Sequence, residues 1–391
     1  MNRVRLVAVT VCLLVALSVA AYGVKEEGAN TSRTTRPTEP VNPAPKVNPR
    51  AVVWRTPTPP AKPQAGDIWV NPRDGMEMVY IPPGEFILGT SNAQIDAWLK
   101  EHPADKREWF KREQPQCRVS LPGYWIGRTE VTNAQYLRFV RATDHRAPDY
   151  WKGRKPPREL GGFPVVDVSW DDANAYCAWA GDSLPTELQW EKAARGTDGR
   201  VFPWGSQWDR TRCRNFELIT GRAYASDGEW DTVMGNWEQA HDPIREGPTA
   251  VGSYPAGAGP YGCLDMAGNV EQWCADSYDE EAYGRYAKGD LRPPRSGSLK
   301  EGACSGVREG PWGNLRPLAS GTLKVLRGGS WGDGYVHWAH EPPLSGASKV
   351  VRGGSWIDGD PWYFRCAYRS LEYPVYLFNG LGFRCAREAS P

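Results

Sequence analysis

The chain has 391 residues, and 46 Asp and Glu residues nearly balance its 47 Lys and Arg residues, which leaves a net charge of +1. On charge alone, this balance excludes a protein that binds nucleic acid or acidic substrates. The 40% of apolar residues suffice for a core, and the 19 Trp, 42 Gly and 34 Pro residues indicate a loop-rich fold packed by large rings.

The first residues have the composition of an export signal. Arg3 and Arg5 precede an apolar run from Leu6 to Val19, and a small-x-small sequence follows at its end. Because the run is short for a membrane span, we predict a cleaved signal peptide over residues 1–23, with an uncleaved anchor as the alternative. We therefore expect an exported protein, extracellular or periplasmic, with no membrane span after cleavage.

The next segment is rich in proline. Residues 31–64 contain nine prolines and few apolar side chains. Proline at this density stiffens the chain toward polyproline II and removes backbone donors. We predict a Pro-rich, disordered linker over residues 24–65 and one folded domain over residues 66–391.

The first part of this domain shows strand and helix signals. Gly75–Thr90, "GMEMVYIPPGEFILGT", has two short β-rich runs around a Pro-Pro-Gly turn. Ser169–Gly181 starts with a capping residue, has apolar residues at helical spacing and ends on glycine, which predicts a helix.

A second helix is predicted over Leu184–Gly196. Thr186 and Gln189 form a T-x-x-Q capping box, and Gly196 is placed to end the helix. No further strong helix is predicted after Gly196, where loops and short strands pinned by Trp and Gly are expected. The fold class is therefore α+β with little regular secondary structure.

Export favours disulfide bonds. Without Cys12, which lies in the signal, eight cysteines remain, an even number that suits an oxidising compartment. Eight cysteines allow 105 pairings, so counting alone leaves the connectivity open. No C-x-x-C pair is present, which argues against a structural zinc site.

Seven motifs, in order from about Asp74 to Arg387, resemble the sulfatase-modifying-factor, or formylglycine-generating-enzyme, family. They are "MVYIPPGEFILGT", "WIGRTEVTNAQYLRFV", "PVVDVSWDDANAYCAWAGDSLPTELQWEKAARG", "FPWG", "GPYGCLDMAGNVEQW", "VVRGGSW" and "LGFRCA". The resemblance covers essentially the whole mature domain. It implies the compact, C-type-lectin-like fold of that family, with bound calcium.

The resemblance breaks at the family's catalytic motif. In its active oxidases, GGS plus an aromatic residue is followed by M-C-x-x-x-x-C, whose two thiolates bind Cu(I) and activate oxygen to oxidise a cysteine in C-x-P-x-R. Here Ile357 and Asp358 follow Trp356, the stretch is two residues shorter, and Cys366 matches a structural cysteine instead. Thiolate suits soft Cu(I) and carboxylate does not, so Cu(I) is not expected. Ser355, Trp356 and Asp358 remain the candidate cleft residues, and no catalytic residue is assigned.

The motif "KVVRGGSWIDG" at residues 349–359 has an earlier copy, "KVLRGGSWGDG", at residues 324–334. The copies agree at nine of eleven positions. Only the second is followed by the family's R-x-A-x-R, so it is interpreted as the family's strand and turn, in which glycine permits close backbone approach and Trp fills the core. The first copy is assigned to an insertion.

The resemblance implies two calcium sites. The first would use Asp265, the carbonyls of Gly268 and Val270, and Gln272, which stands where the family has Glu. Hard oxygen ligands suit Ca²⁺, but a neutral amide should weaken its binding. The second site would use Asn215, the carbonyl of Phe216, Asp242 and the carbonyl of Ile244. A glycine turn capped by Asp is the alternative interpretation of the first motif.

The family's pattern also implies a disulfide between Cys177 and Cys385. The family's other bridge cannot form, because Ala194 replaces its first cysteine. The pairing of the remaining cysteines stays open.

Other chemistry is sparse. Asp333, His337 and His340 have a spacing that could hold a divalent metal, although surface imidazoles are the simpler interpretation. Asp358, Asp360 and Glu372 could form an acidic cleft or a solvated turn. The aromatic residues between Trp356 and Phe378 could stack on sugar or peptide groups or only pack.

Three functions follow from these observations. The first is an exported, copper-free binding or structural module with an unknown protein or carbohydrate ligand. The second is an oxidase or other metal-dependent enzyme of the family with a rebuilt site. The third is a sulfatase activator whose cysteines lie elsewhere, which the missing thiols oppose. We favour the first, and leave open whether any catalysis remains.

Overall fold

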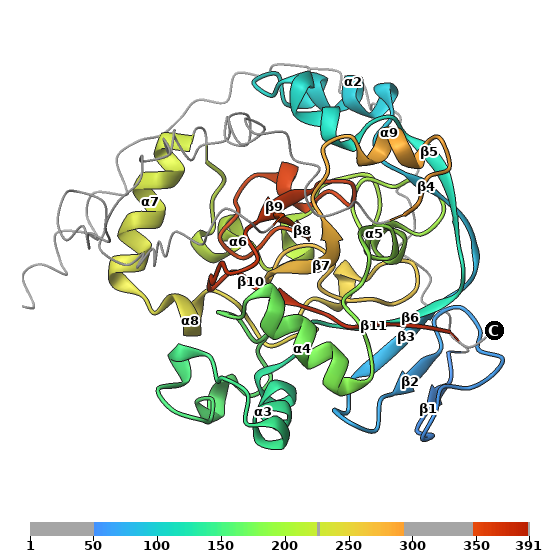
Figure 1. Ribbon diagram of the computed structural model, residues 1–391. Coiled ribbons are helices and arrows are strands. Elements are labelled where there is room, and N and C mark those ends of the chain that lie inside the picture. The colour runs from blue at the N-terminus through green and yellow to red at the C-terminus, as the bar shows by residue number, and fades with distance from the viewer. Residues whose placement is uncertain (1–50, 225–226, 293–346, 390–391) are drawn as a thin grey trace, which may run out of the picture. The chain divides into compact units, whose positions relative to one another are not determined.

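The computed structural model describes residues 51–224, 227–292 and 347–389 (Figure 1). This part of the chain combines three sheets with short helices and long connecting loops. The mixture confirms the predicted α+β class with modest regular structure.

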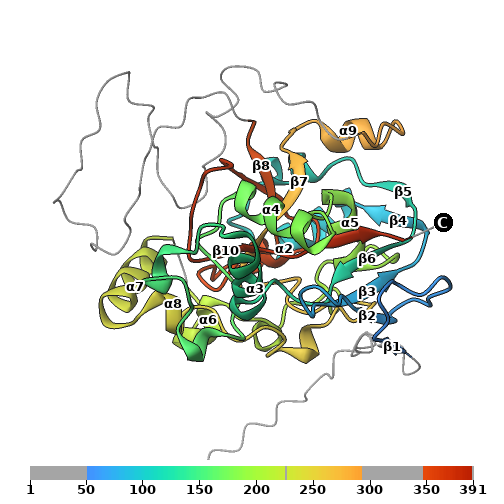
Figure 2. The ribbon, with the colours of Figure 1, turned by 60° about the horizontal axis from the view of Figure 1, so that its bottom comes forward.

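The largest sheet contains strands from both ends of the described chain, which lie at its two opposite edges. Its strand order is β1-β2-β3-β6-β11, with β1 parallel to β2 and the other pairs antiparallel. Both ribbon views show the C-terminal β11 running beside β6 (Figures 1 and 2). Its strands are β1 (Val53–Trp54), β2 (Ile68–Val70), β3 (Glu77–Ile81), β6 (Tyr124–Gly127) and β11 (Ala386–Glu388).

A second sheet, of order β10-β7-β8-β9, carries the RGGSW motif at the end of β8. Here β10 is parallel to β7, and the other pairs are antiparallel. A separate antiparallel pair joins β4 to β5. The strands are β7 (Glu271–Ser277), β8 (Lys349–Arg352), β9 (Ser370–Glu372), β10 (Leu381–Phe383), β4 (Gly84–Leu88) and β5 (Cys117–Leu121).

Four of the helices begin with the same local device, a reciprocal capping box between the N-cap residue and the third helical residue. The α-helices are α2 (Asn92–Glu101), α3 (Asn133–Thr143), α4 (Trp170–Ala180), α5 (Glu187–Arg195), α6 (Phe216–Thr220), α7 (Asp227–Ala240), α8 (Pro243–Glu246) and α9 (Ala282–Tyr286). Short 3₁₀-helices are η1 (Arg107–Glu113), η2 (Asp149–Trp151), η3 (Arg158–Leu160), η4 (Arg210–Arg212), η5 (Pro255–Gly257) and η7 (Pro361–Phe364).

The two predicted helices are confirmed as α4 and α5. Ser169 caps α4, which ends at Gly181 in the left-handed region, and Thr186 with Gln189 forms the predicted box at α5. The two β-rich runs around the Pro-Pro-Gly turn are β3 and β4. Each pairs with a different partner, so the turn separates two sheets.

Two expectations are wrong. Residues before Gly66 are not all linker, because Val53–Trp54 pairs with β2 and the Asp67 carboxylate accepts hydrogen bonds from Val52 N and Gln64 N, each 2.9 Å. A strong helix does follow Gly196, namely α7. The predicted signal peptide and the rest of the linker lie outside the described residues. Among those described, no helix is long and apolar enough to cross a membrane.

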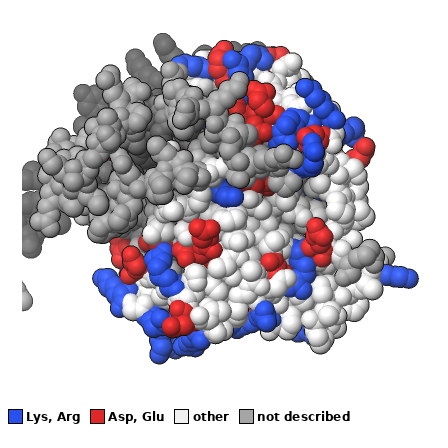
Figure 3. Space-filling model, in the orientation of Figure 1, with Lys and Arg blue, Asp and Glu red and all other residues white. Residues whose placement is uncertain are grey.

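Charge on the surface seen in Figure 3 is mixed. Basic and acidic side chains alternate around this face and leave much of its middle uncharged. Among the described residues on this face, no basic stripe for a polyanion is visible.

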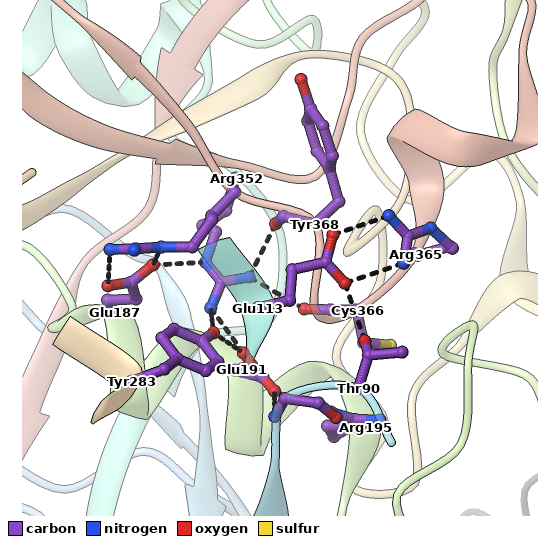
Figure 4. Close-up of polar contacts among 12 residues, drawn as sticks. Thr90, Glu113, Glu187, Glu191, Arg195, Tyr283, Arg352, Arg365, Cys366 and Tyr368 are labelled. Carbon is purple, nitrogen blue, oxygen red and sulfur yellow. Dashed lines mark hydrogen bonds and ion pairs between the residues drawn. The ribbon is translucent and has the colours of Figure 1, made fainter. Parts of the chain in front are cut away.

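The least expected part of the interior is a network of buried ion pairs centred on α5 (Figure 4). Glu191 binds Arg352 from β8 (2.6 Å) and Arg195 (2.7 Å), while Glu187 binds Arg369 through two 2.7 Å hydrogen bonds. Arg352 also lies 3.3 Å from Glu187. Burial alone would raise the pKa of Glu191, but Arg352 and Arg195 hold it below its ordinary value. This network ties β8, and the motif that follows it, to the central helix.

Removing Arg352 should therefore be costly. An Arg352→Ala variant leaves the carboxylates of Glu187 and Glu191 buried without their shared partner, so we expect a loss of about 3–5 kcal/mol in the free energy of unfolding. Urea denaturation measures this loss. The control is Arg118→Ala, because Arg118 and Glu85 are both largely exposed and such pairs contribute little. Equal midpoints for the two variants would contradict the structural role of the network.

Candidate functional site

The site suggested by the sequence begins where β8 ends, at two glycines. Gly353 and Gly354 have φ values of 102° and 62°. A Cβ atom on Gly353 would lie 3.2 Å from the Trp190 ring, and one on Gly354 would lie 3.0 Å from the carbonyl oxygen of Tyr363. Glycine is thus required here for both conformation and space. The strand-and-turn interpretation of this motif agrees with its geometry.

Asp358 is locked into the turn that follows. Its carboxylate accepts hydrogen bonds from the backbone N–H of Ser355 (2.7 Å) and from the Ser355 hydroxyl (3.2 Å). Burial and, to a smaller extent, the charge of Asp360 raise the pKa of Asp358 to about 6, although the hydrogen bonds from Ser355 favour the ionised form. The side chain at the family's first cysteine position is therefore a carboxyl group, and its hydrogen bonds to Ser355 close the local turn.

Trp356 and Ser355 do not line an open pocket, contrary to expectation. Trp356 is fully buried and Ser355 is 1% exposed, whereas Asp358 is partly exposed. The Trp356 ring packs 5.4 Å from Trp237 of α7, in a cluster that also contains Phe216. Both ribbon views place α6, α7 and α8 together on this side of the domain (Figures 1 and 2). Helix α7 therefore fills the space beside the motif.

Helix α7 was not predicted, although the sequence contains its signal. Trp230, Val233, Met234 and Trp237 follow an i, i+3, i+4, i+7 spacing, which is typical of an amphipathic helix. These residues form the apolar cluster around Trp356.

Among the described residues, no thiol stands in for the missing copper ligands. Cys366 lies in a different cluster, among Trp190, Val350 and Cys274, and its backbone N–H bonds to the carbonyl of Val201. Burial raises the pKa of the Cys366 thiol to about 12, so it is protonated at neutral pH. Within the described residues, no group of three or more His, Cys, Asp or Glu side chains could hold a metal ion.

Of the other residues predicted to form a site, the acidic ones near Asp358 are described by the structure. Asp360 caps η7 by accepting a 2.8 Å hydrogen bond from Trp362 N, and Glu372 lies on β9 opposite Lys349. Asp333, His337 and His340, like the first copy of the duplicated motif, lie outside the described residues.

The first predicted calcium set is occupied by protein contacts. The Gln272 amide oxygen accepts hydrogen bonds from Trp190 Nε1 (2.7 Å) and Arg384 Nε (2.6 Å), and its amide nitrogen donates to the Asp265 carbonyl (2.8 Å). Gly268 donates its N–H to the carbonyl of Gly353, and Val270 is buried. A calcium ion at Gln272 would have to displace the Arg384 guanidinium, so this arrangement does not favour the ion.

The second predicted calcium set serves helix capping. Asn215 caps α6 by accepting a 2.9 Å hydrogen bond from Leu218 N, so that Phe216 begins the helix. Asp242 caps α8 by accepting a 3.0 Å hydrogen bond from Ile244 N. Calcium at either set stays a prediction.

The comparisons with known proteins agree with the motifs. Residues 64–389 match the family of the sulfatase-modifying factor enzyme 1-like domain. The chain belongs to this family.

Its relatives include proteins named as formylglycine-generating enzymes and one whose name calls it inactive. The formylglycine-generating enzyme of Streptomyces coelicolor is 29% identical over 384 residues, which cover 85% of this chain and 96% of the relative. The inactive C-alpha-formylglycine-generating enzyme 2 of Bos taurus is 37% identical over 254 residues, or 54% of this chain and 74% of the relative. Among solved structures, PvdO from Pseudomonas aeruginosa matches with a TM-score of 0.51 and 21% identity, covering 84% of this chain and all of PvdO. These matches confirm the formylglycine-generating-enzyme fold.

The two cysteines of the predicted disulfide lie close together. The Sγ atoms of Cys177 on α4 and Cys385 lie 3.1 Å apart in the buried core, within hydrogen-bond distance of each other.

We expect Cys177 and Cys385 to form a bridge under oxidising conditions. A bridge that closes so long a loop could add about 4–5 kcal/mol of stability by chain entropy. Peptide mapping without reductant should find the two residues in one cross-linked peptide. The control is the Cys177→Ser variant, in which Cys385 should become reactive to alkylation only after unfolding. A bridge from Cys177 to any other cysteine would refute the pairing.

Gln272→Glu tests the calcium prediction. The variant loses the amide hydrogen bond to the Asp265 carbonyl and gains the charged oxygen ligand that Ca²⁺ prefers, and the ion must still displace Arg384. We expect the melting temperature of the variant to rise by several degrees between chelator and calcium, and that of the unchanged protein to rise less, since only ion bound to the native state stabilises it. If neither protein responds, both calcium sites are wrong.

Proposed function

We propose that this chain is an exported, non-oxidase member of its family, a module that binds a protein or carbohydrate ligand. The observation that carries the proposal is the carboxylate of Asp358 at the family's first cysteine position, hydrogen-bonded within its own turn. A hard oxygen ligand neither prefers Cu(I) nor reproduces a two-sulfur site.

The surroundings of Asp358 support this proposal. Trp356 is covered by Trp237 of α7, and the buried thiol of Cys366 belongs to a separate cluster. The bovine relative, whose name describes it as inactive, is a precedent for the fold without the oxidase activity. A fold of this kind can be kept while its site changes.

A rebuilt enzyme site is the second candidate, and one observation favours it. Asp358 is partly exposed and its pKa is raised to about 6, which would suit a general acid or base near neutral pH. Asp360 lies close enough for its charge to contribute to this shift. A metal-dependent or acid–base reaction at Asp358 would be abolished by Asp358→Asn.

The proposal predicts that the purified protein binds no Cu(I) tightly and leaves a C-x-P-x-R peptide unoxidised. Metal analysis after anaerobic Cu(I) loading and mass spectrometry of the peptide measure the two properties. The Streptomyces coelicolor enzyme serves as the positive control. The Asp358→Cys variant should stay inactive, because the second thiol and two residues of the loop are also missing. Turnover of the peptide by the unmodified protein would overturn the proposal.

A further inference from the structure

A small cavity lies between α2, α5 and the segment after η7, away from the Asp358 turn. Its volume is about 20 Å³, enough for one particle of the size of a water molecule. It is lined by Thr90, Gln94, Trp98, Phe110, Arg195, Val201, Arg365 and Ala367.

One polar group in its wall has no partner. Arg195 is 1% exposed, and its terminal nitrogens donate hydrogen bonds to Glu191 (2.7 Å), to the Gly89 carbonyl (2.7 Å) and to the Gly199 carbonyl (2.8 Å). The N–H on Nε is buried without an acceptor. Buried donors are rarely left in this state, so an unpaired one points to a bound group.

The other polar side chains of the wall are already engaged. Both terminal nitrogens of Arg365 bind Glu113, and its Nε donates to the Trp362 carbonyl. Thr90 donates its hydroxyl to Glu113, and the Gln94 amide nitrogen donates to Gly199 while its oxygen accepts from Ser91 and Gln116. The wall therefore offers a spare donor but little spare acceptor capacity.

This balance favours an anion over a water molecule. A water molecule needs acceptors for its own hydrogens, and the wall supplies few. An anion only accepts, and the wall contains two guanidinium groups, whose paired carboxylates on Glu191 and Glu113 are not among the lining residues. Apart from Thr90 and Gln94, the rest of the wall is apolar or aromatic, so an ion there would lose its water and be attracted more strongly to Arg195.

We propose that the cavity binds a single-atom monovalent anion, a halide, through Arg195 Nε. The site is separate from the Asp358 turn and does not depend on the function proposed there. A bound halide would complete the hydrogen bonding of Arg195, which in turn holds Glu191 in the ion-pair network.

The test compares thermal unfolding of the full protein in sodium chloride, sodium bromide and sodium gluconate at matched ionic strength. We expect a melting temperature higher by a few degrees in the two halides, because a ligand bound to the native state stabilises it by mass action. Crystals soaked in bromide should show an anomalous peak within hydrogen-bond distance of Arg195 Nε.

Two variants make the test specific. Ala367→Leu fills the cavity and leaves both arginines in place, and Arg195→Lys keeps the charge near Glu191 but removes the Nε donor. Both should lose the difference between halide and gluconate. The reference is Arg118→Ala, which alters an exposed charge and should keep that difference. Equal melting temperatures in all three salts, with water in the cavity of a bromide-soaked crystal, would overturn the proposal.

Discussion

The interaction on which the rest of the structure depends is the pairing of two acidic residues on α5 with arginines from distant strands and loops. Glu187 and Glu191 lie one turn apart on the buried face of the helix, so both carboxylates point into the same region. Burying charge is expensive unless each group meets its partner in good geometry. The strand β8 is therefore held at the register that brings Arg352 to these carboxylates.

That constraint reaches the candidate site through the backbone. Arg352 fixes the end of β8, the two following glycines pack against Trp190 and the chain near Tyr363, and the turn closes on Asp358. None of these steps requires a cysteine. The scaffold of the family's oxidase motif is thus built by ion pairs and glycines, which explains how the fold persists when the copper ligands are gone.

Local chemistry allowed part of this structure to be predicted. The helices α4 and α5 were found because their capping boxes and terminal glycines are contiguous in sequence, and β3 and β4 because short β-rich runs flank a turn. The partner of Glu191 could not be found this way, because Arg352 is 161 residues away and its pairing depends on tertiary packing. The burial of Trp356 was missed for a related reason. Trp356 is buried by α7. The apolar periodicity of α7 is visible in the sequence, but its packing on Trp356 depends on the tertiary structure.

The network also limits what the duplicated motif can do. The earlier copy repeats the arginine, the glycines, the tryptophan and the aspartate, but the described domain presents one pair of α5 carboxylates, and Arg352, Arg195 and Arg369 already bind them. A second arginine in the same place would be an uncompensated buried cation. Within the described residues, these carboxylates therefore leave one place for such a strand, and the second copy fills it.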